Sequence, residues 1–151
     1  MQSGWIRRYR IPLTIVAAVL LYLVVAIDHP LRDFTTNHAE IAEDSTDQRL
    51  RPRVYDLTIP EVVEAIEQAA LRISNWEYVG DAGVGDVTQI LFVRTSRVWR
   101  FKDDVTLKLE TRDGRTVVTG ESRSRVGVGD LGQNPRNLHR ILSELDTVLG
   151  L

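Results

Sequence analysis

The residues best suited to chemistry lie between Glu121 and Arg136, in the segment ESRSRVGVGDLGQNPR. Two of its arginines are two residues apart on an expected strand, so both side chains project from the same face. A glycine-rich loop follows and leads to an expected helix start, where free N–H groups and the positive dipole end favour anions. We therefore predict an anion or partner site for a carboxylate, a phosphate or a lipid headgroup. Its candidate residues are Arg123, Arg125, Asp130, Asn134 and Arg136.

Two other interpretations of this segment remain open. In the first, Asp130 accepts a forked hydrogen bond from Arg125 or Arg123 and only fixes the loop, while Asn134 only caps the helix. In the second, Asp130 is the acid or base of an envelope enzyme, since no other residue here could serve. A nucleotide loop is not indicated, because the glycines are not followed by the Lys-Ser/Thr pair that such loops need.

The segment Thr95–Asp104 (TSRVWRFKDD) interleaves basic and aromatic residues. This pattern is compatible with nucleic-acid binding or with contact to a membrane surface. The interpretation that we favour places Trp99 or Phe101 in the core as a lid, with Asp103 and Asp104 in a turn. The two aspartates do not form a catalytic pair, because neighbouring side chains on an extended chain point in opposite directions.

Composition argues against several classes of site. The chain has no cysteine, a formal charge of −2, and three histidines without metal-ligand spacing. Ser122 and Ser124 have no histidine or lysine nearby in sequence, and there is no G-x-S-x-G elbow. We therefore expect no metal and no cofactor, and a binding or assembly module in preference to an enzyme.

Apolar periodicity predicts an α+β domain over residues 53–151, in the order β-α-β-β-β-β-α. A single antiparallel sheet with both helices on one face is the simplest way to bury both helical stripes. A capping box at Thr58 and Glu61 predicts the first helix, and Asn134 is expected to be the N-cap of the second. The expected strands are Val54–Leu57, Trp76–Gly80, Val87–Arg94, Val105–Thr111 and Thr116–Arg125, with a glycine-rich loop over Gly80–Asp86 and a hairpin turn at Asp113-Gly114.

The N-terminus predicts a membrane anchor. Residues 11–27 (IPLTIVAAVLLYLVVAI) carry no charge and follow a basic stretch, residues 1–10, with three arginines near its end. As a helix this run is about 25 Å long, close to the thickness of the bilayer core. The arginines favour a cytoplasmic N-terminus, which places everything after residue 28 across the membrane. A cleavable signal peptide is the alternative.

The segment between the anchor and the domain, residues 28–52, is polar and unpatterned. It is expected to be a tether, with Ile41 and Leu50 too isolated to build a core.

The chain has an FKDD segment, then a hairpin strand, and then the stretch SRSRVGVGDLGQN that leads into an apolar helix. Together these motifs resemble the DUF1499 family, a bacterial and plastid group of unknown function that often carries an N-terminal hydrophobic segment. The resemblance covers Val54 to Leu149 and is most specific over Ser122–Asn134. Glu121 and Gly129 depart from the family pattern, where arginine and serine are common. The matching positions are Asp103, Asp104, Ser124, Arg125, Gly127, Asp130, Gly132 and Asn134. The resemblance implies a domain and supplies no substrate.

The sequence thus predicts a single-pass protein of a bacterial inner membrane, with its α+β domain in the periplasm. The expected role is binding or envelope assembly, with an anionic ligand, a lipid headgroup or an envelope protein as partner and no nucleic acid.

Overall fold

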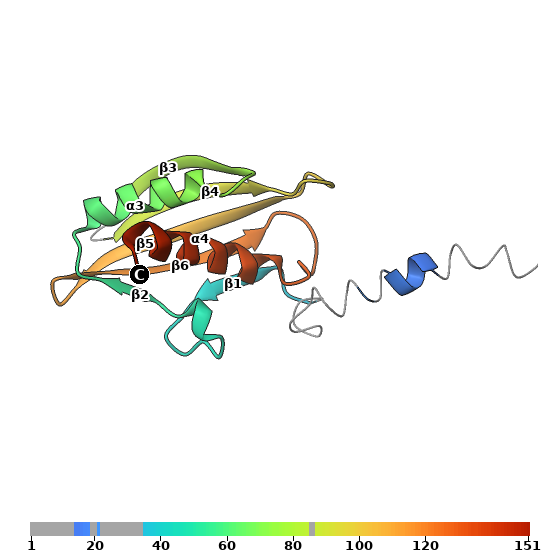
Figure 1. Cartoon of the computed structure of the whole chain (residues 1–151), viewed down its shortest axis with the longest axis horizontal. Helices are drawn as coiled ribbons and strands as arrows, with labels where there is room; N and C mark the ends of the chain where they lie inside the picture. Colours follow the sequence, from blue (N-terminus) through green and yellow to red (C-terminus); the bar gives the residue numbers. More distant parts are fainter. Residues whose placement is uncertain (1–13, 19–20, 22–34, 85–86) are drawn as a thin grey trace, which may run out of the picture.

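The computed structural model describes residues 14–18, 21, 35–84 and 87–151 (Figure 1). The described residues from 35 onward form six strands, two α-helices and one 3-10 turn. These are β1 (His38–Ile41), η1 (Gln48–Leu50), β2 (Arg53–Tyr55), α3 (Ile59–Leu71), β3 (Trp76–Val84), β4 (Val87–Thr95), β5 (Lys102–Arg112), β6 (Arg115–Ser124) and α4 (Gln133–Leu149).

The strands form one antiparallel sheet in the order β1-β6-β5-β4-β3. Strand β2 also pairs with β6, at residues 116–118, next to the residues 120–123 that pair with β1. The predicted hairpin turn at Asp113-Gly114 is confirmed: it joins β5 to β6. Both of its residues have positive φ (51° and 76°), as a two-residue turn matched to the strand twist requires.

Both helices pack on one face of the sheet and share one core with it, which confirms the predicted α+β architecture (Figure 1). On β5 the inward residues Val105, Leu107 and Leu109 are buried, as their alternation predicted. The capping box of α3 is present at Thr58 and Glu61. The apolar stripe of α4 is buried at Leu138, Ile141, Leu142 and Leu145.

The prediction of a tether over residues 28–52 is wrong for its second half. Residues 38–41 form strand β1 on the edge of the sheet, and Ile41 and Leu50 are each only 5 % exposed in the core. The N–H of Ala42 donates to the carbonyl of Leu50 at 3.1 Å, which closes the loop between them. Two apolar side chains are enough to hold this segment on the domain, because β6 supplies the backbone hydrogen-bond partners of β1 and the other elements supply the rest of the core.

Two strand boundaries also differ from prediction. Strand β3 continues to Val84, so most of the expected loop Gly80–Asp86 is paired with β4. Strand β5 begins at Lys102, so Asp103 and Asp104 lie in a strand and not in a turn. Glycines and charges did not end these strands because a partner strand continues alongside each: β4 beside β3, and β4 and β6 beside β5.

Among the described residues, no helix is long and apolar enough to cross a membrane. The predicted transmembrane segment, residues 11–27, and the basic stretch before it lie largely outside the described residues. Residues 14–18 and 21 are described, and they are helical and exposed.

Candidate functional site

The start of α4 is capped by Asp130. Its two carboxylate oxygens accept hydrogen bonds from the N–H groups of Gly132 (2.9 Å) and Asn134 (2.6 Å). The N-cap position belongs to Gly132, whose φ of 74° suits glycine, so the prediction that Asn134 caps the helix is wrong. Asp130 therefore supplies, from within the chain, the negative charge that the free N–H groups of a helix start favour.

Asn134 instead lies in the first turn of α4, where it is fully buried, and its side chain joins three segments of the chain. Its side-chain carbonyl accepts from Ser122 Oγ at 2.6 Å, and its amide donates to Ser124 Oγ at 3.1 Å and to the carbonyl of Asn37 at 2.7 Å. These bonds fix the end of β6 and the chain before β1 against the helix.

The same buried network continues to Asp103 on β5, which is 3 % exposed. Its carboxylate accepts from Ser124 Oγ at 2.7 Å, from the Asn137 amide at 3.1 Å and from the guanidinium of Arg94 at 2.8 Å. Among the described residues, no buried side-chain nitrogen or oxygen is left without a partner. A network that is fully satisfied in this way fixes how the helix sits on the sheet.

The two predicted strand arginines do not contact Asp130. Arg125 forms a forked ion pair with Asp104, with its Nη2 at 2.6 Å and its Nε at 3.0 Å from Asp104 Oδ1. This pairing raises the pKa of Arg125. The prediction that Asp130 accepts a forked hydrogen bond from Arg125 or Arg123 is therefore wrong. Arg123 is exposed on β6, so the five candidate residues do not form one cluster.

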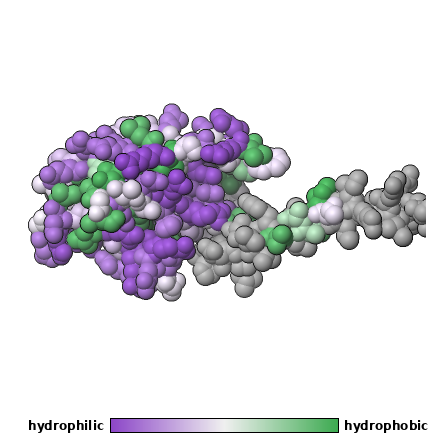
Figure 2. Space-filling view, in the orientation of Figure 1, coloured by the Kyte–Doolittle hydropathy of each residue, from purple (hydrophilic) through white to green (hydrophobic). Residues whose placement is uncertain are grey.

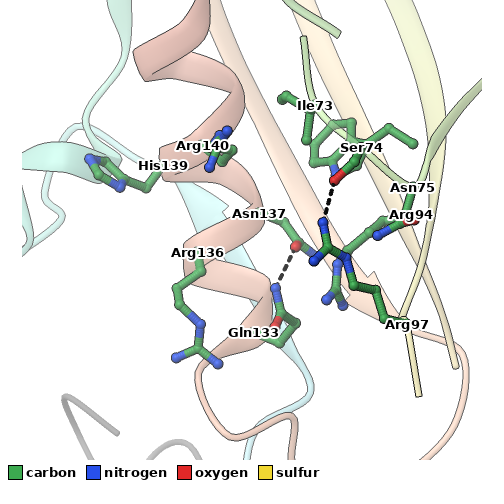
Figure 3. Close-up of a pocket in the computed structure, with 11 residues that line it drawn as sticks. Ile73, Ser74, Asn75, Arg94, Arg97, Gln133, Arg136, Asn137, His139 and Arg140 are labelled. Carbon is green, nitrogen blue, oxygen red and sulfur yellow. Dashed lines mark hydrogen bonds between the residues drawn. The ribbon is translucent and has the colours of Figure 1, made fainter. Parts of the chain in front are cut away.

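A pocket of about 480 Å³ opens between α4 and the neighbouring ends of α3, β3 and β4. Its described lining holds four arginines and a histidine, and no carboxylate. The lining residues are Ile73, Ser74, Asn75, Trp76, Arg94, Arg97, Gln133, Arg136, Asn137, His139 and Arg140. Figure 3 shows Gln133 and Asn137 of α4 facing Arg94 and Arg97 across it. We call this the basic pocket.

The cations of the basic pocket differ in how far their charge is compensated. Arg94 is paired with Asp103, and Arg140 with Glu144 at 3.1 Å. Arg97 donates to a neutral hydroxyl, Ser74 Oγ, at 2.9 Å. The charge of Arg97 is therefore available to an anion. Because its side chain is exposed, it can turn toward a bound anion at small cost.

Of the predicted site residues, only Arg136 lines this pocket. Sequence reasoning missed the others because they come from separate elements that only the fold brings together. One signal was present: Gln133, Arg136, Asn137 and Arg140 are spaced three and four residues apart, which places them on one side of a helix.

A second, mostly apolar pocket of about 390 Å³ adjoins the basic pocket, because Ile73 and Trp76 line both. Its other lining residues are Glu67, Ala70, Leu71, Tyr78 and Phe92. The rings of Trp76 and Tyr78 lie 5.6 and 5.8 Å from that of Phe92. We call this the apolar pocket. The two pockets together present a positive region beside a hydrophobic one.

Within the described ranges, no three histidine, aspartate or glutamate side chains converge as metal ligands would. The basic pocket offers guanidinium groups, which carry positive charge and donate hydrogen bonds, and the neutral side-chain amides of Asn75 and Gln133. The amide of Asn137 already donates to Asp103 and Ser122.

Comparison with known proteins gives one result. No curated protein matches the chain. The family model described as "Protein of unknown function (DUF1499)" matches residues 31–145, including the segment of β1 and η1. The match extends across the helices and strands that build both pockets, and on this evidence the chain belongs to the DUF1499 family.

Proposed function

We propose that this protein is a binding module that holds an anionic group in the basic pocket. The observation that carries the proposal is the lining: four arginines and the side-chain amides of Asn75 and Gln133 surround a pocket whose described lining contains no acidic residue. Guanidinium groups form forked, charge-assisted hydrogen bonds with carboxylates and phosphates. An anion here would meet the exposed guanidinium of Arg97 and the side-chain amide of Gln133 on α4.

The ligand class follows from both pockets. The basic pocket suits a phosphate or carboxylate, and the adjoining apolar pocket suits a hydrocarbon or aromatic part of the same molecule. A lipid headgroup and a free phosphorylated metabolite share this anionic chemistry. An alkyl phosphate that binds more tightly than inorganic phosphate would assign the pockets to a lipid-like ligand, and equal binding would assign them to a free anion.

The proposal is confined to binding. Asp130, the one candidate acid or base, lines neither pocket, and both of its carboxylate oxygens hold backbone N–H groups. A carboxylate engaged in this way is occupied as a helix cap.

We further propose that residues 11–27 anchor the chain in the inner membrane, with the N-terminus in the cytoplasm and the domain in the periplasm. The uncharged run and the preceding arginines support this topology. A reporter active only outside the cytoplasm, fused after Leu151, is expected to give signal from cells that retain the fusion in membranes. No signal would put the domain in the cytoplasm and overturn the location.

Replacing Arg97 with alanine is expected to weaken phosphate binding about tenfold or more. A hydrogen bond to a charged group contributes about 1.5–3 kcal/mol, and each 1.4 kcal/mol is a factor of ten in Kd. Calorimetric titration of the full chain with inorganic phosphate measures this change. Because Arg97 is exposed, the fold should be unaffected, and unfolding by urea checks that.

The matched control is Arg115→Ala. Arg115 is also exposed, but it lies at the β5–β6 hairpin, away from both pockets. The Arg115→Ala variant should bind phosphate as tightly as the unchanged chain. Equal losses in the two variants would mean that phosphate responds only to net charge, which contradicts a built site.

A further inference from the structure

The turn between β4 and β5 carries apolar side chains outward. Val98 is 78 % exposed, Trp99 75 % and Phe101 52 %, so the prediction that an aromatic residue enters the core here is wrong. Two hydrogen bonds close this turn: Ser96 N–H donates to the Phe101 carbonyl, and Phe101 N–H donates to Ser96 Oγ, both at 2.8 Å. The tip is therefore a defined structure that presents hydrophobic groups to its surroundings.

A second exposed apolar loop lies beside the first. The loop after β6 carries Val126 and Val128, which are 63 % and 79 % exposed. Arg125 joins the two loops, because its N–H donates to the carbonyl of Lys102 at 2.9 Å and its side chain pairs with Asp104. Figure 2 shows hydrophobic residues at the upper right of the molecule, where the β4–β5 turn lies in Figure 1.

Positive charge surrounds these apolar groups. Exposed cations come from the β4–β5 turn and from the strand ends next to the two loops: Arg100, Lys102 and Arg123. Of the nearby acids, Asp104 is paired with Arg125, and Asp130 caps α4. Apolar side chains with a basic rim are the pattern that binds the surface of an anionic bilayer.

The chain enters the domain at this same end. The carbonyl of Thr36 accepts from the N–H of Asp130 at 3.2 Å, and that of Asn37 from the N–H of Ser124 at 3.0 Å. Only residues 28–34 separate the predicted anchor from Thr35. Seven residues span at most about 25 Å.

The opposite end of the sheet is out of reach for the same connection. Strand β5 has 11 residues, which corresponds to about 35 Å from the two loops to the β5–β6 hairpin. Figure 1 shows the two loops and the β5–β6 hairpin at opposite ends of the sheet. An anchored chain would therefore hold the loop end toward the bilayer, with the hairpin pointing away.

We propose that the loop end is a membrane-docking surface, in which Val98, Trp99, Phe101, Val126 and Val128 enter the headgroup region of a bilayer containing anionic lipid. The surrounding cations contact the lipid phosphates. This inference uses the anchor proposed above and does not depend on ligand binding in the pockets.

Because the chain has no cysteine, single cysteines can carry spin labels at chosen positions. The test places Val98→Cys, Val128→Cys and Val54→Cys separately in the full chain, in vesicles of phosphatidylcholine with phosphatidylglycerol. Val54 is the matched control, an exposed valine on β2 toward the far end. Labels at 98 and 128 are expected to collide several-fold less with a water-soluble nickel complex, and more with oxygen, than the label at 54.

Omitting phosphatidylglycerol is expected to reduce this difference, since the basic rim then loses its partner. If the chain stays in the vesicles but all three labels are equally accessible to nickel, the anchor stands and the docking surface is wrong. If the chain does not associate with vesicles, both are wrong. Phosphate binding in the basic pocket is unaffected by either outcome.

Discussion

Replacing Asp103 with alanine is expected to lower the free energy of unfolding by about 3–5 kcal/mol, the usual cost of removing one partner of a buried ion pair. The carboxylate is buried and accepts from Arg94, Ser124 and Asn137. Without it, the guanidinium loses its counter-ion, and donors from β6 and α4 lose their acceptor. Urea unfolding of the full chain, followed by far-UV circular dichroism, measures the loss.

The next residue provides a matched control. Asp104 lies on the same strand as Asp103 and is also paired with an arginine, but its side chain and that of Arg125 are each about half exposed. Asp104→Ala should cost less than about 1 kcal/mol, as exposed ion pairs do. Asp103→Asn, which keeps the shape and loses the charge, should lie between the two. Similar losses for Asp103→Ala and Asp104→Ala would contradict a structural network beneath α4.

Replacing Ile41 with alanine is expected to cost about 2–5 kcal/mol, the range for truncating a buried aliphatic side chain. Ile41 lies in the shared core, opposite Gly120 on β6. If residues 38–41 were part of a tether, the same change would have almost no effect. The same unfolding measurement applies.

The control for Ile41→Ala is Val54→Ala, a truncation at an exposed position on the neighbouring strand β2. It should change the free energy of unfolding by less than about 0.5 kcal/mol. A loss at Ile41 as small as that at Val54 would show that β1 does not contribute to the stability of the domain.

Much of the fold was predictable because local signals and burial agreed. The alternation of Val105, Leu107 and Leu109, the turn at Asp113-Gly114 and the apolar stripe of α4 each specify one element by themselves. Strand β1 was not predictable in this way. Four residues with one buried side chain, Ile41, carry no recognisable period, and their pairing with β6 depends on an edge that forms elsewhere in the chain.

The candidate site shows a different limit. The segment from Ser122 to Asn134 was correctly identified as unusual, but its residues mainly hold α4 on the sheet. Gly132 decides which polar residue caps the helix. Its positive φ makes α4 begin at Gln133, one residue before Asn134, and the carboxylate of Asp130 then reaches the free N–H groups. The basic pocket needs α3, β4 and α4 to meet, so spacing along the chain reveals only its α4 residues.

The central claim is that an anion binds in the basic pocket, and nuclear magnetic resonance of the full chain titrated with inorganic phosphate tests it most directly. We predict saturable shifts centred on Asn75, Arg97 and the side-chain amide of Gln133. Shifts confined to Arg123 and the loop before α4, or no saturable shifts at all, would contradict the account.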